Sequence, residues 1–308
     1  MKLTKNILLL TILLIVPFLG TAQQQPQFTQ YMYNTISFNP AYAGSREIMV
    51  INVLNRNQWV GINGAPVTQT LSAHTSVPNT KFGVGLSVIK DELGYENSTY
   101  AYADVSYTIT LNKYDAYKFA FGLKIGASKY DLDENLMNSN GNSSDPFLDM
   151  VNFDWTPNIG AGFYFRGESF YIGLSAPKLI DYKKTNIDYV TLDRVSYFFN
   201  GGYLLDVNKN LKFKPTFLLK YTQGAPVSMD LSTLFFVNEK LWLGASYRLF
   251  DSFGAIINFK VFDGLSLGYA YDYITSDLSS YSSGSHEFMI NYEFVFPKPR
   301  CKCKDLYN

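Results

Sequence analysis

The residue types best suited to catalysis or metal binding are rare in this chain and widely spaced. His74 and His286 are the only histidines, and Cys301 and Cys303 are the only cysteines. A zinc site or a catalytic histidine needs partners at a recognisable spacing, and neither histidine has them. We interpret both histidines as polar side chains that line an interior. The two thiols stand among lysines, which can activate a thiol, but their place in the tail favours an exposed, frayed segment.

Two further segments have the composition of binding loops but lack the required spacing. The segment "GVGLSV" at residues 83–88 contains Gly-x-Gly, yet no helix follows that could hold a nucleotide phosphate. The segment "DLDENLMNSNGNSSD" at residues 131–145 is rich in oxygen ligands, but it lacks the glycine and final glutamate of a calcium loop. We interpret it as a solvated surface loop. The sequence therefore predicts no enzyme, no metal and no cofactor.

The N-terminal residues have the three-part layout of a secretory signal peptide. The first five residues contain two lysines and precede the apolar run "NILLLTILLIVPFL" at residues 6–19. The small residues "GTA" follow this run. The apolar run of about fourteen residues is shorter than the ~20 that a membrane-spanning helix needs. We expect residues 1–22 to be removed and the mature chain to begin at Gln23.

The composition of the chain is more typical of a membrane protein than of a soluble protein. Aromatic residues make up 17%, with 24 Tyr and 24 Phe, whereas charged residues also make up only 17%, below the ~25% usual for soluble domains. The 26 basic and 26 acidic residues balance, so no charge excess points to nucleic acid. Two cysteines cannot form a disulfide scaffold.

Apolar and polar residues alternate through most of the mature chain, which is typical of strands with one apolar face. The segments "KFAFGLKIGAS", "GLSLGYAYDY" and "HEFMINYEFVF" show the pattern, with small or charged residues on the second face. Apolar residues outside and polar or glycine residues inside are typical of membrane barrels. We expect Phe121, Leu123 and Ile125 to face lipid and Lys124 to face the lumen. Leu123→Arg should then impair folding far more than Lys124→Glu.

About fourteen such strands can be counted, and the connections between them alternate in length. The expected strands are 47–60, 66–76, 81–90, 99–111, 117–130, 155–166, 169–176, 195–207, 211–222, 226–237, 240–249, 254–262, 264–275 and 285–296. The longest connections follow odd strands and tight turns follow even ones, which is the outer-membrane layout with short turns in the periplasm. The sequence predicts an all-β fold: a transmembrane antiparallel β-barrel over residues 47–296, with both chain ends and the tail 297–308 in the periplasm.

The stretch "QFTQYMYNTISFNPAYAGS" before the first strand has no helix or strand periodicity but many aromatic rings. Two roles remain open for residues 23–46: a plug inside the barrel mouth, or a periplasmic segment that presents Tyr31, Tyr33, Phe38 and Tyr42 to a partner. The strand glycines also have two possible uses, relief of crowding or close approach of a plug. These glycines are Gly83, Gly85, Gly122, Gly126, Gly160, Gly162 and Gly173.

Four segments of the chain together resemble the PorP/SprF family of outer-membrane proteins. They are "PQFTQYMYNTISFNPAYAGS", "RNQWVGINGAPVTQTLSAH", "GVGLSVIKDELG" and "SHEFMINYEFVF", which lie between residues 26 and 296. The resemblance and the residue types give a set of candidates for partner binding or for a plug: Tyr31, Asn34, Asn39, Pro40, Tyr42, Gly44, Arg56, Gln58, Trp59, Gln69 and His74. The tail "PKPRCKCKDLYN" extends past the usual strand end.

The resemblance implies a non-enzymatic barrel of the type IX secretion and gliding-motility machinery in the cell outer membrane. Its implied partners are outer-membrane lipid, secreted or surface-anchored cargo such as adhesins, and periplasmic machinery components. Two other functions compete with this hypothesis. A barrel of this size could be a solute channel or a transporter of hydrophobic substrates, and an outer-membrane enzyme is disfavoured because no nucleophile–base pair is present.

Overall fold

The structure is a computed structural model that describes residues 26–112, 116–132, 153–180 and 194–294. The signal peptide, the two cysteines and most of the acidic loop fall outside this part of the chain. The strands within it are β1 (Met49–Asn57), β2 (Val67–Ser76), β3 (Phe82–Leu93), β4 (Glu96–Thr110), β5 (Lys118–Leu132), β6 (Phe153–Arg166), β7 (Phe170–Ala176), β8 (Ser196–Tyr203), β9 (Leu205–Asn208), β10 (Leu211–Thr222), β11 (Ser228–Val237), β12 (Leu241–Arg248), β13 (Ser252–Phe262), β14 (Leu265–Ile274) and β15 (Ser285–Phe294).

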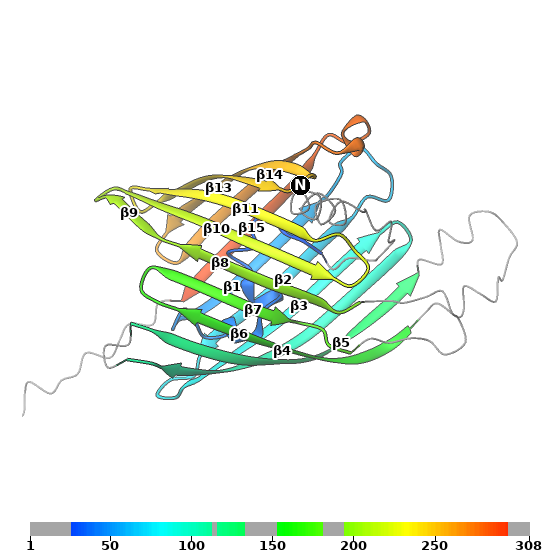
Figure 1. The fold of residues 1–308 in the computed structure, drawn as a ribbon. Helices are drawn as coiled ribbons and strands as arrows, with labels where there is room; N and C mark the ends of the chain where they lie inside the picture. Colours follow the sequence, from blue (N-terminus) through cyan, green and yellow to red (C-terminus); the bar gives the residue numbers. More distant parts are fainter. Residues whose placement is uncertain (1–25, 113–115, 133–152, 181–193, 295–308) are drawn as a thin grey trace, which may run out of the picture.

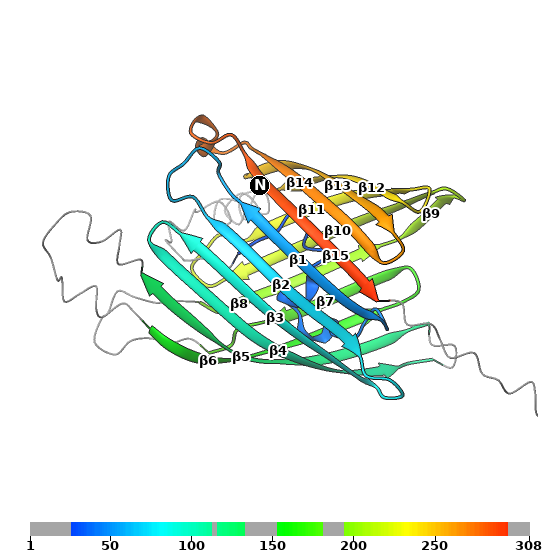
Figure 2. The ribbon, with the colours of Figure 1, turned by 180° about the vertical axis from the view of Figure 1, so that it is seen from behind.

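The strands form one antiparallel sheet that closes on itself. Apart from β8 and β9, each strand pairs with its neighbours along the chain, and β1 pairs with β15, so the sheet closes into a barrel (Figure 1 and Figure 2). The short β9 follows β8 after a break at Leu204, and both pair with β10. They therefore act as one wall strand, which makes a barrel of fourteen. The prediction of an antiparallel barrel of about fourteen strands is confirmed.

Side chains on β5 show how the alternating sequence sorts between the two faces of the wall. Phe121, Leu123 and Ile125 are 42%, 59% and 62% exposed, while Lys124 between them is fully buried. Apolar groups outside and polar groups inside suit a barrel whose exterior contacts hydrocarbon and whose backbone bonds are all paired between strands. On β5, the side chains therefore face inward and outward as the sequence predicts.

The two ends of the barrel differ in the length of their connections. One end, here the long-loop end, carries residues 58–66 and 275–284 and the connections that include 133–152 and 181–193. The opposite end, the short-turn end, carries the brief turns 167–169, 209–210, 238–240 and 263–264.

Residues 26–46, here the luminal segment, lie inside the barrel and are the blue chain seen within the ring of strands (Figure 1 and Figure 2). The segment contains two 3-10 turns, η1 (Thr35–Ser37) and η2 (Pro40–Tyr42), while a third, η4 (Asp277–Ser280), lies in the last long loop. No helix in the described part of the chain is long and apolar enough to cross a membrane.

Candidate functional site

The luminal segment runs from the long-loop end to the short-turn end before the chain enters β1. The Gln27 amide donates to Ser228 Oγ at the start of β11, which is the long-loop end. The backbone N–H of Gly44 donates to His74 Nδ1 near the end of β2, which is the short-turn end. The described chain therefore starts at one end of the barrel and leaves it at the other. The expectation that both chain ends lie in the periplasm stays a prediction, because residues 1–25 and 295–308 lie outside the described part of the chain.

A buried ionic cluster fastens the start of the luminal segment to the wall. The two carboxylate oxygens of Glu287 accept the backbone N–H groups of Thr29 and Gln30, at 2.9 and 2.8 Å. Arg56 pairs with Glu287 at 3.0 Å and with Asp272 at 2.8 Å, and all three side chains are at most 5% exposed. Buried charges are tolerated only when they are paired and hydrogen-bonded. This cluster, on β1, β14 and β15, is therefore a specific anchor for the segment.

Polar side chains fasten the middle of the segment on several sides of the lumen. Asn34 donates from Nδ2 to Thr70 Oγ1 and accepts from Ser72 Oγ, both at 3.0 Å. The Tyr31 hydroxyl bonds to Thr216 on β10 at 2.8 Å. Lys124 pairs with Asp104 at 2.8 Å and donates to the backbone carbonyl of Ile36 at 3.2 Å.

The irregular conformation of the segment follows from its sequence. The Asn39 side chain accepts from the backbone N–H of Ala41, and Pro40 occupies the first position of η2, where its missing N–H costs nothing. The Asn39 amide also donates to the Phe163 carbonyl on β6 at 3.1 Å. A run rich in capping residues thus forms short turns instead of a long helix.

Two strand glycines allow the backbone of the luminal segment to touch the wall. A Cβ added at Gly122 would overlap the backbone of Pro40 and Ala41, and one added at Gly83 would overlap the Ala43 carbonyl. At these positions the glycines serve the close approach of the segment. The Gly126 site differs, because a Cβ there would meet the wall's own backbone and the Tyr102 ring.

Most of the candidate residues from the sequence meet in the lumen. Tyr31, Asn34, Asn39, Pro40, Arg56 and His74 are buried there, and Tyr42 and Gly44 follow at the short-turn end. The Tyr42 ring stands edge-on to His74 and Tyr164, with ring centres 5.1 and 5.4 Å away. Tyr31 and Phe38 are therefore enclosed, whereas Tyr33 and Tyr42 remain at the edge of a cavity.

The other three candidates lie elsewhere. Gln58 and Trp59 belong to the loop after β1 at the long-loop end, where the Trp59 backbone N–H donates to Ser285 Oγ at 3.2 Å. Gln69 is exposed on the outer side of β2, since Thr68 and Thr70 are its inward neighbours. The sequence signature therefore does not map to a single surface.

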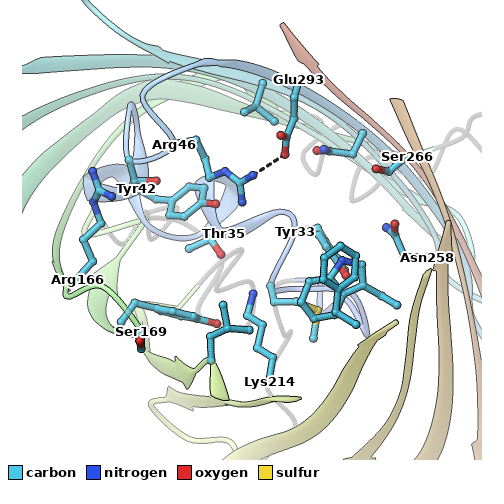
Figure 3. Close-up of a pocket in the computed structure, with 18 of the residues that line it drawn as sticks. Tyr33, Thr35, Tyr42, Arg46, Arg166, Ser169, Lys214, Asn258, Ser266 and Glu293 are labelled. Atoms are coloured by element: carbon cyan, nitrogen blue, oxygen red, sulfur yellow. Dashed lines mark hydrogen bonds and ion pairs between the residues drawn. The ribbon is translucent and has the colours of Figure 1, made fainter. Parts of the chain in front are cut away.

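The short-turn end opens into a cavity of about 560 Å³, here the vestibule. Figure 3 shows Tyr33, Tyr42 and Arg46 of the luminal segment above Lys214 of β10, with Asn258 of β13 at one side. Arg46 pairs with Glu293 at 2.7 Å. The vestibule thus combines aromatic rings with charged groups, which suits a peptide better than a purely apolar ligand.

A second ion-pair group lies at the rim of the same end. Glu47 accepts from Lys118 at 2.6 Å and from Arg166 at 2.7 Å. The hydrogen bond from Lys118 lowers the pKa of the Glu47 carboxyl; partial burial opposes it, and Arg166 adds to the lowering. These contacts join the chain just after the luminal segment to β5 and β6 at the short-turn end.

Several of these residues were not identified from the sequence. Asp272, Glu287, Lys214 and Arg46 were not among the candidates, although the alternating pattern already placed Asp272 and Glu287 on the inward face. Charged residues at inward positions were the available signal. Among the described residues, no group of three or more His, Cys, Asp or Glu is arranged to hold a metal ion.

A closed antiparallel sheet with an apolar exterior and a polar lumen, crossed by the chain's own N-terminal segment, defines a membrane β-barrel. A family model described as type IX secretion system membrane protein PorP/SprF matches residues 20–292. The chain belongs to this family and is an outer-membrane protein.

Several solved structures similar to this chain are porins. The NanC porin has 9% identity and a TM-score of 0.42, covering 80% of this chain and 100% of that one. The KdgM porin has 9% identity and a TM-score of 0.37, with 80% and 99% covered. A mutant of the Rhodopseudomonas blastica porin has 8% identity and a TM-score of 0.34, with 80% and 99% covered. No curated protein sequence matches the chain.

Proposed function

We propose that this barrel acts in the type IX secretion and gliding machinery as a non-enzymatic partner in the export or surface anchoring of secreted proteins such as adhesins. The observation that carries the proposal is the fastening of the luminal segment to β2, β5, β6, β10 and β15. A segment held on so many sides obstructs the lumen, which favours a docking role over that of an open solute channel.

The two ends of the barrel suit different partners under this proposal. Short turns face the periplasm in outer-membrane barrels, so the vestibule would face the periplasmic machinery components. The long-loop end, with Trp59 and the longest connections, would face the cargo at the cell surface. The barrel then joins two partners across the membrane without transporting either through its lumen.

A deletion strain tests the proposal. Removing the gene should leave the cargo protein undisplayed at the cell surface, and the wild-type gene should restore display. Affinity isolation of the protein from gently solubilised membranes should recover periplasmic machinery components and the cargo. A deletion strain that keeps all surface cargo and loses only the uptake of a small solute would overturn the proposal in favour of the transporter function.

A further inference from the structure

The vestibule contains a basic side chain that no carboxylate of the described residues neutralises. Four basic residues line the cavity, and three of them have acidic partners: Arg46 pairs with Glu293, Arg166 with Glu47 and Lys260 with Asp263. The ammonium group of the fourth, Lys214, forms no ion pair or hydrogen bond among the described residues. Its ammonium group instead lies 5.6 Å from the centre of the Tyr171 ring and 5.8 Å from that of Trp242.

The position of Lys214 makes its charge available to a ligand. The side chain points into the vestibule (Figure 3), and it is partly buried between the two rings. Aromatic faces stabilise a cation by about 0.5–2 kcal/mol, less than a carboxylate does in such a site. An acidic group that entered the vestibule would therefore gain a charge-assisted hydrogen bond from Lys214.

A second donor on the vestibule wall also lacks an acceptor. Asn258 is 2% exposed and lines the cavity, and its Nδ2 has no hydrogen-bond partner among the described residues. Buried donors are normally paired, so an unpaired one at a cavity wall indicates a position for an acceptor. A peptide supplies both kinds of acceptor, a side-chain carboxylate for Lys214 and a backbone carbonyl for Asn258.

We propose that the vestibule binds an extended, acidic and aromatic segment of a periplasmic protein, with an aspartate or glutamate side chain on Lys214 and a backbone carbonyl on Asn258. The aromatic residues of the segment would pack against the rings of Tyr33, Tyr42 and Trp242. The proposal rests on the proposed function, because it takes the short-turn end to meet the periplasmic machinery, and it specifies the chemistry of that contact.

The test uses two amidated hexapeptides carrying the same neutral fluorophore, one alternating aspartate with tyrosine and the other asparagine with tyrosine. Fluorescence anisotropy with the purified full-length barrel in detergent should show saturable binding of the acidic peptide, weakened by salt. The neutral peptide should bind roughly tenfold or more weakly, because a charge-assisted hydrogen bond is lost. Equal affinity for the two peptides would overturn the proposal.

Variants locate the binding. Lys214→Gln should weaken the acidic peptide roughly tenfold or more, while Lys214→Arg retains binding and Lys240→Gln, at an exposed turn of the same end, leaves it unchanged. Asn258→Asp should also weaken binding of the acidic peptide, because the new carboxylate repels the acidic side chains of the peptide. This second variant tests the site if Lys214→Gln does not fold. Unchanged affinity for the acidic peptide in folded Lys214→Gln would show that the peptide does not bind at Lys214. An equal loss of affinity in Lys240→Gln would show the same. Because these assays use purified protein, they can fail while cargo display in cells remains dependent on the barrel.

Discussion

Arg56 and Glu287 face each other across the seam where β1 and β15 close the barrel, and their side chains form an ion pair of 3.0 Å. The same carboxylate accepts the backbone N–H groups of Thr29 and Gln30. One buried acidic side chain therefore takes part both in the closure of the wall and in the fastening of the luminal segment.

Replacing Glu287 should destabilise the barrel and loosen the luminal segment together. Glu287→Ala leaves Arg56 with one fewer buried partner and two backbone donors without acceptors, so we expect a loss of about 3–5 kcal/mol in the free energy of unfolding. Denaturant unfolding measures that loss, and limited proteolysis should cut within residues 26–46. The matched control is Glu92→Ala, which removes an exposed ion pair with Lys90 and should cost at most about 1 kcal/mol. Equal losses would mean that the cluster is not an anchor.

A side chain at Gly122 should displace the luminal segment while the wall remains folded. The Cβ of Gly122→Val would occupy the space of the Pro40 and Ala41 backbone. We expect higher ion conductance in planar bilayers than for the wild type, because the segment obstructs the lumen. Ala103→Val adds the same side chain on the exposed face of β4 and should leave conductance unchanged. If both variants conduct like the wild type, the segment does not control access to the lumen.

The alternating pattern was sufficient to predict the strands, their inward and outward faces and the unequal loops. It was not sufficient to predict contacts across the lumen. A two-residue period tells which face of the wall carries Lys124 or Glu287, but the partner inside depends on how a nonperiodic segment folds. For the same reason, sequence proximity grouped Tyr42 with Trp59, although the first lies at the short-turn end and the second at the long-loop end.

The structure changes the expected tolerance at neighbouring positions of β5. Leu123 is exposed on the outer face, so Leu123→Arg should still cost about 2–4 kcal/mol near the middle of the bilayer. Lys124→Glu, expected from the sequence to impair folding far less than Leu123→Arg, would place a second buried carboxylate beside Asp104 and remove the donor to Ile36. We expect both variants to reduce the folded fraction in heat-modifiability gels, and Leu123→Ala to fold normally. Normal folding of Lys124→Glu would contradict the buried pair.

The Glu47 group should make a small, pH-dependent contribution to stability. Because Lys118 and Arg166 lower the folded-state pKa of Glu47, the contribution is present above the unfolded-state pKa of about 4.3. It is lost as the pH falls through the lower folded-state pKa. Wild-type protein should therefore melt at a higher temperature than Glu47→Gln at about pH 7, and the difference should shrink at about pH 3. Glu239→Gln, at an exposed turn of the same end, should show no such difference; a Glu47→Gln effect that is constant with pH would contradict the assignment.

Tyr42 and Trp59 should affect different partners, because they lie at opposite ends of the barrel. Tyr42→Ala removes a ring that packs between His74 and Tyr164 beside the vestibule, so it should weaken co-purification of periplasmic machinery components. Trp59→Ala should instead reduce cargo at the cell surface while machinery components still co-purify. Truncating an interface anchor typically costs about 2 kcal/mol, roughly thirtyfold in affinity.

The controls for these two positions are Tyr42→Phe and Trp59→Phe, which keep an aromatic ring at each site. Outer-membrane abundance and heat-modifiable mobility must be measured in the same cells, since the Tyr42 ring also packs against His74 and Tyr164, and the Trp59 backbone is hydrogen-bonded to Ser285. If protein level, cargo display and co-purification fall together in an alanine variant, that ring only stabilises the barrel. If both alanine variants lose the same partner at normal abundance, the assignment of one partner to each end is wrong, because a single interface would then include both residues.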